Sequence, residues 1–444
     1  AILRERFATV PRIALTATAD VPTRQEIAQR LLLDPRVFVA SFDRPNIRYR
    51  IIEKRDPRDQ LLRFIRDEHS ADAGIVYCLA RNTVDEVAAF LCANEIPALP
   101  YHAGMDATAR SANQNAFLQQ DGCVIVATIA FGMGIDKPDV RFVAPLDMPK
   151  SIEGYFQETG RAGRDGEPAD AWMTYGLGDV VQQRRLIEMS EADALYKRLS
   201  GKKLDAMLGL AEAADCRRVR LLSYFGEASE PCGNCDNCLM PPQRVDATEA
   251  ARKLLSCIYR CERGSGFGFA ATHIIDVLRG KQTEKVAKFG HEGLSTFGIG
   301  AELSEAEWRL LLRHLGAQHI VEVDHATFNV LRLTDASRAV LRGERAIELR
   351  HQVAQPRRRK SKQRATSAAT HEHDPLFETL RVWRATVAKE HGLPAFVVFH
   401  DGTLRAIAQV RPKSLDELRT ISGIGEKKLA SYGEGLLALL AAGA

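Results

Sequence analysis

The chain has 444 residues, with 45% hydrophobic and 27% charged side chains and a formal net charge of +4. This length suggests about three or four globular domains, and so small a net charge excludes a whole-chain field that would by itself select a polyanion. Nine cysteines in so long a chain exclude the disulfide framework of a small secreted protein. We find neither a signal peptide nor an apolar run of about twenty residues, so we expect a cytoplasmic protein without a membrane partner.

The first predicted elements are a strand and a helix. Residues 12–19 form an apolar run that includes the small hydroxyl side chains Thr16 and Thr18, and this run predicts a buried strand. Val21 and Pro22 are typical of a helix start, and we expect the helix to extend to Leu33.

Residues 45–182 alternate apolar strands with helical segments, which is typical of a parallel α/β sheet. The predicted strands are apolar on both faces, as central parallel strands are, and cover Gly74–Cys78, Cys123–Thr128 and Val140–Ala144. Helices are predicted over residues 84–94 and 107–119. Ligands of such sheets bind beyond the carboxyl ends of the strands. Three candidate loops follow such ends and contain Arg81; Tyr101 and His102; and Thr128, Gly132, Gly134 and Asp136.

The segment QETGRAGRDG, residues 157–166, combines two arginines with three glycines. Arg161 and Arg164 share one face if the preceding helix continues that far, and the glycines let the backbone approach a ligand closely. Arginine suits bidentate contact with phosphate, and an inserted arginine stabilises the charge on a transferring γ-phosphate. The alternative is a helix end with surface arginines. The full spacing favours nucleotide chemistry, with Gln157, Arg161 and Arg164 as candidate catalytic residues.

Four cysteines have metal-ligand spacing. Cys216 is followed by Cys232, Cys235 and Cys238 in a CxxCxxC turn, and four thiolates that converge tetrahedrally suit Zn²⁺. An iron–sulfur cluster requires a different spacing, and free buried thiols are not expected in a polar turn. Four protein ligands leave no open position for water, so the predicted zinc is structural.

Residues 246–350 predict three helices followed by two strands, which is the order of a winged helix. The helices are expected at 248–259, 271–279 and 305–315, and the strands at 319–323 and 328–333. A winged helix reads DNA or docks a protein. Arg279 and Lys281 lie beside helix termini, which favours phosphate contacts. The hairpin tip at His325 is either a strand-separating wedge or a plain wing.

The remaining chain contains a linker and a helical region. Residues 355–364 are polar and basic without apolar periodicity, which predicts a disordered tether. From Asp374 onward, Leu376, Leu380, Trp383 and Val387 step at helical spacing, so a small all-α bundle is expected.

These motifs, taken in this order, resemble the RecQ family of superfamily 2 DNA helicases. QETGRAGRDG resembles motif VI, ALTATA motif III, TIAFGMGIDKPDVR motif V and YHAGM a conserved helicase element; Arg81 lies where motif IV is expected. The segments after the cysteines resemble the RecQ C-terminal winged helix and an HRDC bundle. The resemblance implies six parts: 1–44, the end of a first RecA-like lobe; 45–182, a second RecA-like lobe; 183–243, a zinc-binding helical hairpin; 244–350, a winged helix; 351–372, a basic linker; and 373–444, an HRDC domain.

The resemblance also implies an activity and its residues. The family unwinds DNA by 3′-to-5′ translocation powered by ATP and Mg²⁺, in repair and recombination. Arg164 would be the arginine finger, with Arg161 and Gln157 binding or coupling the phosphates. Gly134 and Asp136 would face the nucleotide, and Arg81 and Thr128 would hold the DNA backbone. Expected partners are single-stranded and duplex DNA and a single-stranded-DNA-binding protein, in the bacterial nucleoid.

One part of the family pattern is missing from these residues. The sequence contains neither GxxxxGK[ST] nor Asp-Glu-x-His, so we expect a chain that lacks the front of its first lobe and does not hydrolyse ATP efficiently alone. The rival hypothesis is a non-catalytic DNA-binding or strand-annealing protein, and a third is a zinc-containing regulator. An ATPase assay with single-stranded DNA separates the first two.

Overall fold

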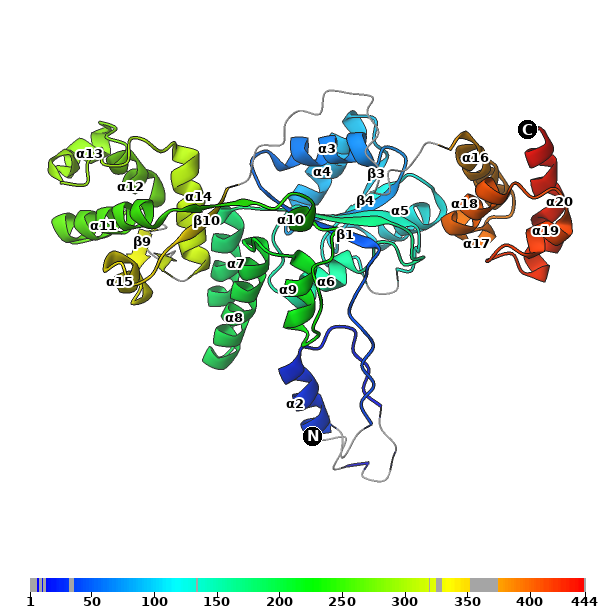
Figure 1. The fold of residues 1–444 in the computed structure, drawn as a ribbon, viewed down its shortest axis with the longest axis horizontal. Coiled ribbons are helices and arrows are strands. Elements are labelled where there is room, and N and C mark those ends of the chain that lie inside the picture. The colour runs from blue at the N-terminus through cyan, green and yellow to red at the C-terminus, as the bar shows by residue number, and fades with distance from the viewer. Residues whose placement is uncertain are drawn as a thin grey trace. The chain divides into compact units, whose positions relative to one another are not determined.

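The computed structural model describes residues 6–7, 10, 13–31, 36–132, 135–318, 320–324, 330–351 and 374–442 (Figure 1). The chain divides into two compact units, which are considered separately below. One comprises Ala1–Asp43, Met148–Tyr155 and Tyr175–Gln355, and the other Arg44–Asp147, Phe156–Thr174 and Pro356–Ala444. The predicted linker lies almost entirely outside the described residues.

The second unit contains a six-stranded sheet in the order β1-β6-β5-β2-β4-β3. The pairs β2–β4, β2–β5, β3–β4 and β5–β6 are parallel. The strands are β1 Ile47–Glu53, β2 Ala73–Tyr77, β3 Ala98–Tyr101, β4 Val124–Ala127, β5 Val140–Pro145 and β6 Ala169–Tyr175. This sheet confirms the predicted α/β class, and the three strands named from sequence are found as β2, β4 and β5.

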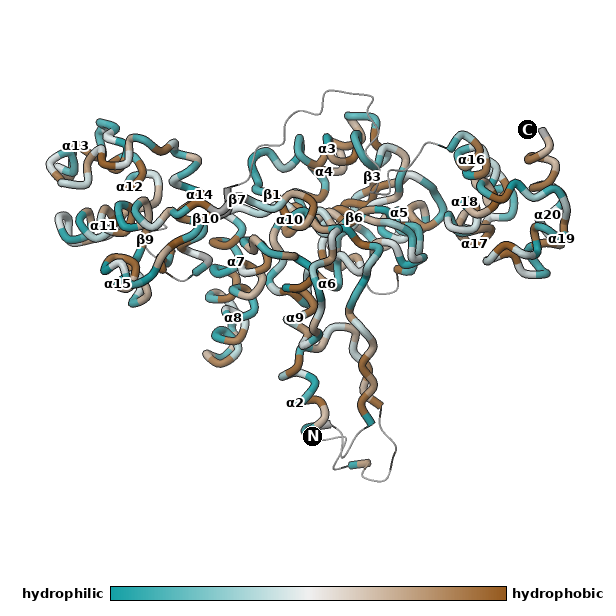
Figure 2. Tube along the Cα trace, viewed as in Figure 1, coloured by the Kyte–Doolittle hydropathy of each residue, from teal (hydrophilic) through white to brown (hydrophobic). Residues whose placement is uncertain are grey.

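The sheet packs against helices on an apolar core. The helices of this region are α3 Pro57–Glu68, α4 Arg81–Ala93, α5 Ala107–Gln119 and α6 Ile152–Thr159. Leu61 and Phe64 of α3 and Val87 and Leu91 of α4 form one buried cluster with strand residues such as Val76. Burial on both faces explains why β2, β4 and β5 are continuous apolar runs. In Figure 2, hydrophobic and hydrophilic stretches alternate along helices α3 and α4, as expected for helices with one buried face.

The predicted N-terminal strand is wrong for the described residues, whereas the helix after it is found as α2 Val21–Leu31. Residues 13–16 belong to no strand or helix. Ile13 and Leu15 are 83% and 86% exposed although both are hydrophobic. A segment forms a strand only where a neighbouring strand supplies backbone hydrogen-bond partners, and no described strand pairs with this one.

The first unit contains two modules in sequence. The first is helical: α7 Leu177–Met189, α8 Ala194–Ala211, α9 Arg217–Tyr224 and the short α10 Asp236–Leu239. The sequence placed a helical hairpin around residues 195–213, but most of these residues form the single helix α8, which packs against α7. The cysteines lie at the start of α9 and around α10.

The second module has the winged-helix order. It comprises α11 Thr248–Ser265, α12 Ala271–Leu278, α13 Glu284–Lys288, η1 His291–Gly293, α14 Glu305–Ala317, β8 Val321–Asp324, β9 Val330–Leu333 and α15 Ala336–Leu341. β8 and β9 pair antiparallel as predicted. A ladder that the sequence did not reveal joins β7 Gln243–Asp246 to β10 Glu348–His351. Trp308, Leu254 and Ile275 are among the residues of its buried core.

Residues 374–442 form a separate all-α bundle, as predicted. Its helices are α16 Pro375–Glu390, α17 Ala395–Val398, α18 Asp401–Val410, α19 Leu415–Arg419 and α20 Glu426–Ala442. Leu380, Phe399, Leu404 and Leu436 lie in its core. Among the described residues, no helix has the length and apolar character that crossing a bilayer requires.

Candidate functional site

Three loops of the sheet begin at the same edge. In the parallel register, Ala127 at the end of β4 pairs with Tyr77 at the end of β2 and with Tyr101 at the end of β3. The loops that carry Arg81, His102 and Thr128 therefore leave the sheet at one level, where α/β sheets bind ligands. The order of the strands, which brings these loops together, could not be predicted from the sequence.

Arg161 is fixed on the loop that follows β4. Its Nη1 donates a hydrogen bond to the carbonyl oxygen of Gly132 at 2.7 Å. A Cβ atom at Gly132 would lie 2.3 Å from Nη2 of Arg161, so only glycine admits the guanidinium at this distance. The hydroxyl of Tyr77 donates to the carbonyl of Phe131 at 2.9 Å and holds the same loop. The Nε atom of Arg161 is buried and has no hydrogen-bond partner among the described residues.

Arg164 pairs with a second residue of that loop. Its Nη1 donates to Oδ1 of Asp136 at 2.8 Å and to the carbonyl of Ile135 at 3.0 Å. The Asp136 side chain is 81% exposed, so the ion pair faces solvent and is weak. The structure thus brings together Arg161, Arg164 and Asp136, which the sequence proposed for one site. Gly134 lies outside the described residues.

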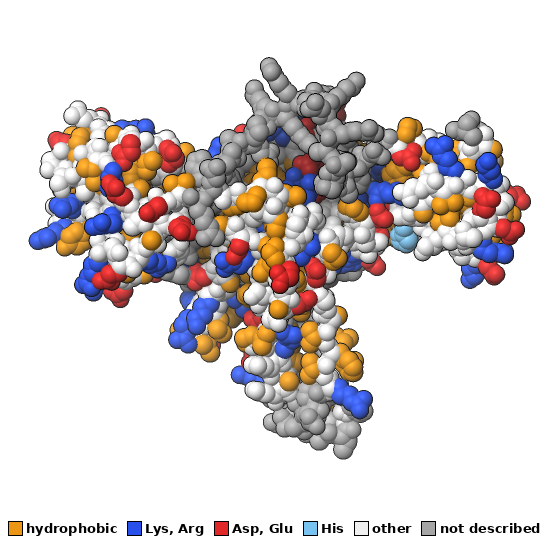
Figure 3. All heavy atoms as spheres, viewed as in Figure 1, with side chains coloured by type: hydrophobic (Ala, Val, Ile, Leu, Met, Phe, Trp, Pro, Cys, Tyr) orange, Lys and Arg blue, Asp and Glu red, His pale blue; other side chains and the backbone are white. Residues whose placement is uncertain are grey.

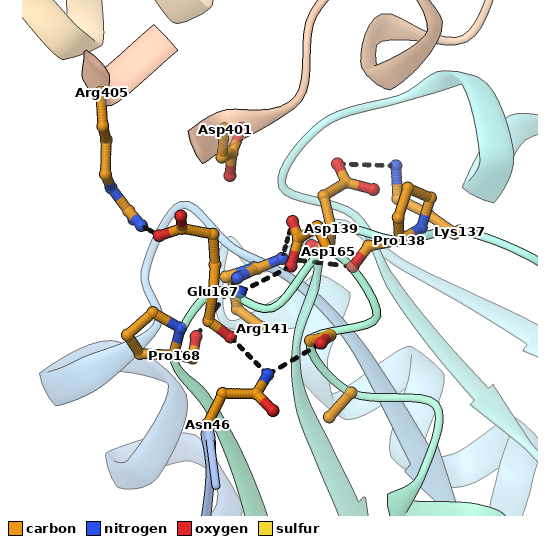
Figure 4. Close-up of polar contacts among 12 residues, drawn as sticks. Asn46, Lys137, Pro138, Asp139, Arg141, Asp165, Glu167, Pro168, Asp401 and Arg405 are labelled. Atoms are coloured by element: carbon orange, nitrogen blue, oxygen red, sulfur yellow. Dashed lines mark hydrogen bonds and ion pairs between the residues drawn. The ribbon is translucent and has the colours of Figure 1, made fainter. Parts of the chain in front are cut away.

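Arg44 and Asn46 hold the turn that carries the arginine pair. Arg44 donates to the carbonyls of Gly160, Ala162 and Gly163, at 2.8–2.9 Å. The Nδ2 of Asn46 donates to the carbonyls of Gly163 and Glu167, each at 2.8 Å (Figure 4). Sequence reasoning missed both residues, because no motif marks a polar residue before a strand as a partner of a loop more than one hundred residues away.

A buried ion pair closes the other end of this turn. Arg141 of β5 pairs with Asp165 at 2.5 Å, and each side chain is 3% exposed. Arg141 also donates to the carbonyls of Pro138 and Pro168, as Figure 4 shows. The segment after α6 is therefore anchored on both sides of Arg164, and this anchoring fixes where the side chain projects.

Gln157 and Glu158 have different surroundings on α6. Gln157 is exposed, whereas Glu158 is buried. Burial raises the pKa of Glu158 to about 8, although the nearby Arg161 guanidinium opposes the shift. At neutral pH this carboxyl group is therefore mostly protonated.

Arg81 and the loop after β3 are neighbours. A Cβ at Gly104 would lie 3.3 Å from Cδ of Arg81, and Arg81 is exposed at the first turn of α4. His102 holds the loop itself, because its Nε2 lies 3.1 Å from Asp85 and its Nδ1 accepts from the Gly104 amide at 3.1 Å. An exposed cation beside a fixed loop can contact a phosphate backbone.

The four cysteines converge in the first unit. Sγ atoms of Cys216, Cys232, Cys235 and Cys238 all lie within 4.8 Å of one another. Cys216–Cys235 and Cys232–Cys238 are each separated by 4.0 Å, close to the roughly 3.8 Å expected for tetrahedral zinc thiolates with Zn–S bonds of about 2.3 Å. Backbone amides of residues 217, 232, 234 and 235 point at three of these sulfurs, as they do at thiolate ligands. The donor set fits Zn²⁺.

From the sequence alone, Arg217, Arg218 and Arg220 after Cys216 are expected to contact DNA or to form a solvated helix face. Arg217 is 1% exposed and pairs with Asp236 at 2.9 Å. It also donates to the carbonyls of Leu210 and Ala211. The sequence hypothesis for Arg217 is therefore wrong, because its side chain is committed to joining α8 to the cysteine turn. Arg220, by contrast, is exposed and pairs with Asp215.

In the winged helix, Lys281 is paired with two carboxylates, Asp276 at 3.3 Å and Glu305 at 3.6 Å. Arg279 ends α12, and its Nε has no hydrogen-bond partner among the described residues. His325 lies outside the described residues. On the face drawn in Figure 3, basic and acidic side chains are interspersed over this module.

Four family models match consecutive parts of the chain. They are the helicase conserved C-terminal domain at residues 56–166, RecQ zinc-binding at 177–239, the RQC domain at 241–358 and the HRDC domain at 373–440. The match to the zinc-binding family, together with the four converging sulfurs, identifies a structural zinc centre. Three similar proteins align with almost the whole of this chain.

The protein named ATP-dependent DNA helicase RecQ from Haemophilus influenzae is 39% identical over 99% of this chain and 70% of its own length. The Bacillus subtilis protein of the same name is 36% identical over 95% of this chain and 68% of its own length. The RecQ-like DNA helicase BLM of Xenopus laevis is 33% identical over 99% of this chain and 34% of its own length.

Proposed function

Because the chain belongs to the RecQ family of DNA helicases, we propose that it supplies one face of an ATP site and the DNA grip of a 3′-to-5′ helicase. The main support is that both arginines are hydrogen-bonded to the loop after β4. Nη1 of Arg161 lies 2.7 Å from the Gly132 carbonyl oxygen, and Nη1 of Arg164 lies 2.8 Å from Oδ1 of Asp136. Such a helicase acts in DNA repair and recombination.

The two arginines have different roles in this proposal. Arg164 has an exposed, solvent-screened partner in Asp136, so its guanidinium can exchange that partner for a γ-phosphate at low cost. Arg161 is partly buried and hydrogen-bonded to the loop after β4. It would therefore bind a phosphate and couple that binding to the conformation of the loop, together with Gln157. When bound, ATP with Mg²⁺ supplies the transferring phosphoryl group. Glycine at 132 leaves room for the Arg161 guanidinium, and glycine at 163 leaves room for Asn46 Nδ2 and the Glu167 carbonyl.

The residues proposed to contact DNA lie at the same edge of the sheet and in the winged helix. Arg81 and Thr128 would hold the phosphate backbone of one strand. Arg279 is the better phosphate contact of the winged helix, because Lys281 already has two carboxylate partners. His325, which the sequence predicts at the hairpin tip, would separate strands. We propose a single-stranded-DNA-binding protein as a further partner and the nucleoid as the location. Membership of the RecQ family is the support for these two proposals.

We also propose that the 444 residues alone bind DNA without hydrolysing ATP, since they contain no GxxxxGK[ST] to cradle the phosphates. This property also fits the rival function, a non-catalytic DNA-annealing protein. The two are separated by fusing, before residue 1, the residues of the Haemophilus influenzae relative that precede its match to this chain. DNA-stimulated ATPase that depends on Arg164 favours the helicase, and annealing without turnover favours the rival.

The test of the arginine finger uses that fusion. Arg164→Ala is expected to lower DNA-stimulated ATP turnover by about 10³-fold, while affinity for single-stranded DNA changes by less than roughly twofold. Arg185→Ala, which removes an exposed arginine of α7, is the matched control and should leave both unchanged. Turnover that survives in Arg164→Ala would reject the assignment.

A further inference from the structure

A second cluster of metal-binding side chains lies inside the winged helix. Cys261 is on α11, His273 on α12 and His291 begins η1, and all three are buried. One ligand atom from each lies within 4.8 Å of the other two. These residues are in three different elements, so the fold itself assembles the cluster.

The hydrogen bonds among these groups leave ligand capacity unused. Nε2 of His273 lies 2.7 Å from Nδ1 of His291, and Ser265 Oγ lies 3.0 Å from Nε2 of His291. Nδ1 of His273 is buried with no hydrogen-bond partner among the described residues. An imidazole pair held only by hydrogen bonds would explain the first contacts. It would not explain a buried ring nitrogen without a partner, which costs free energy.

A second thiol lies beside Cys261, outside the group of three. Cys257 is one helical turn before Cys261 on α11, and their Sγ atoms are 3.9 Å apart. This separation is close to the roughly 3.8 Å between two thiolates on one tetrahedral zinc ion. If Cys257 turns toward the imidazoles when the ion binds, the four residues give the Cys₂His₂ combination that Zn²⁺ prefers.

The surroundings of the cluster are aromatic and dry. The Phe269 ring stacks on His273 at 4.3 Å between centroids and meets His291 edge-on at 4.8 Å. Phe289 packs against the same Phe269 at 5.1 Å. Such a shell excludes water from a metal ion and holds the imidazole rings in place.

We propose that Cys261, His273 and His291, with Cys257 as fourth ligand, form a second Zn²⁺ site that ties α11, α12 and η1 together. Each thiol that binds the ion releases its proton to solvent. The site is structural, because four protein ligands leave no position for a substrate. It is independent of the ATP chemistry and distinct from the four-cysteine centre.

The test counts zinc on the full chain. After loading with Zn²⁺ and dialysis, elemental analysis of the wild-type protein should give two ions per chain. Cys261→Ser and His273→Gln should each retain one, as should Cys232→Ser, which breaks the four-cysteine centre. Cys92→Ser, at an exposed cysteine, is the matched control and should retain two. Two ions retained by Cys261→Ser would overturn the proposal.

X-ray absorption at the zinc edge of the wild-type protein provides a second measurement that needs no variant. Nitrogen scattering beside sulfur is expected, because the second site contributes two imidazoles. A single ion per chain with a sulfur-only shell would overturn the proposal, even if Cys261→Ser failed to fold.

Discussion

Loss of the buried Arg217 side chain should destabilise the zinc-binding module far more than loss of the exposed Arg220 side chain, three residues further along α9. Arg217 is buried, pairs with Asp236 through both Nε and Nη2, and donates to the carbonyls of Leu210 and Ala211. Arg217→Met keeps most of the side-chain volume but leaves a carboxylate that is 11% exposed without its cation. Breaking one partner of a buried pair typically costs about 3–5 kcal/mol, and we expect a loss in that range.

The assay is urea unfolding of the zinc-loaded chain followed by circular dichroism. Arg220→Met is the matched control: its pair with Asp215 is about half exposed on both sides, and such pairs contribute about 0–1 kcal/mol. Asp236→Asn combined with Arg217→Met should cost less than the sum of the two single changes, because the second change removes the charge that the first leaves unpaired. Equal losses of unfolding free energy in Arg217→Met and Arg220→Met would refute the reasoning.

Two further predictions concern the arginine loop. Gly132→Ala places a Cβ 2.3 Å from Nη2 of Arg161, so it should displace the guanidinium and lower ATP turnover in the fusion at least tenfold. Gly178→Ala is the control, because a Cβ there meets no atom within 4 Å, and it should leave turnover unchanged. Equal turnover in the two variants would contradict the close packing of Gly132 against Arg161. Burial raises the pKa of Glu158 to about 8, above its unfolded value, so its contribution to stability is present at pH 4.5 and is lost as pH rises toward 8, with a slope of up to about 1.4 kcal/mol per pH unit. Glu158→Gln should remove that part of the pH dependence of urea unfolding, and an unchanged slope would show that the carboxyl is ionised in the fold.

The sequence predicted those parts of the fold that have a strong local signal. β2, β4 and β5 are apolar on both faces, and the bundle helix α16 has regular apolar spacing. β1 was not predicted, because Arg48 and Arg50 alternate with its buried residues. Their ion-pair partner Asp170 is on the neighbouring strand β6, 122 residues after Arg48 in the sequence. The strand order likewise depends on contacts that no local pattern encodes.

The candidate site shows the same limit. Residue type and spacing selected Arg161, Arg164 and the four cysteines, which the structure gathers into the expected groups. The supports Arg44 and Arg141 were missed, because their partners are carbonyl groups or a carboxylate distant in sequence. Arg217 was misread, since a run of arginines on a short helix looks the same whether one of them is buried or not.

The short ladder between β7 and β10 has a practical consequence. Leu349 pairs with Val245 and Glu348 with Asp246, so the polypeptide leaves the winged helix beside the point where it came in. Adjacent strands are only about 4.8 Å apart, and a tight turn of a few residues can span that gap. The whole winged helix can therefore be deleted, or exchanged for that of a relative, as one cassette, leaving the flanking parts of the chain joined.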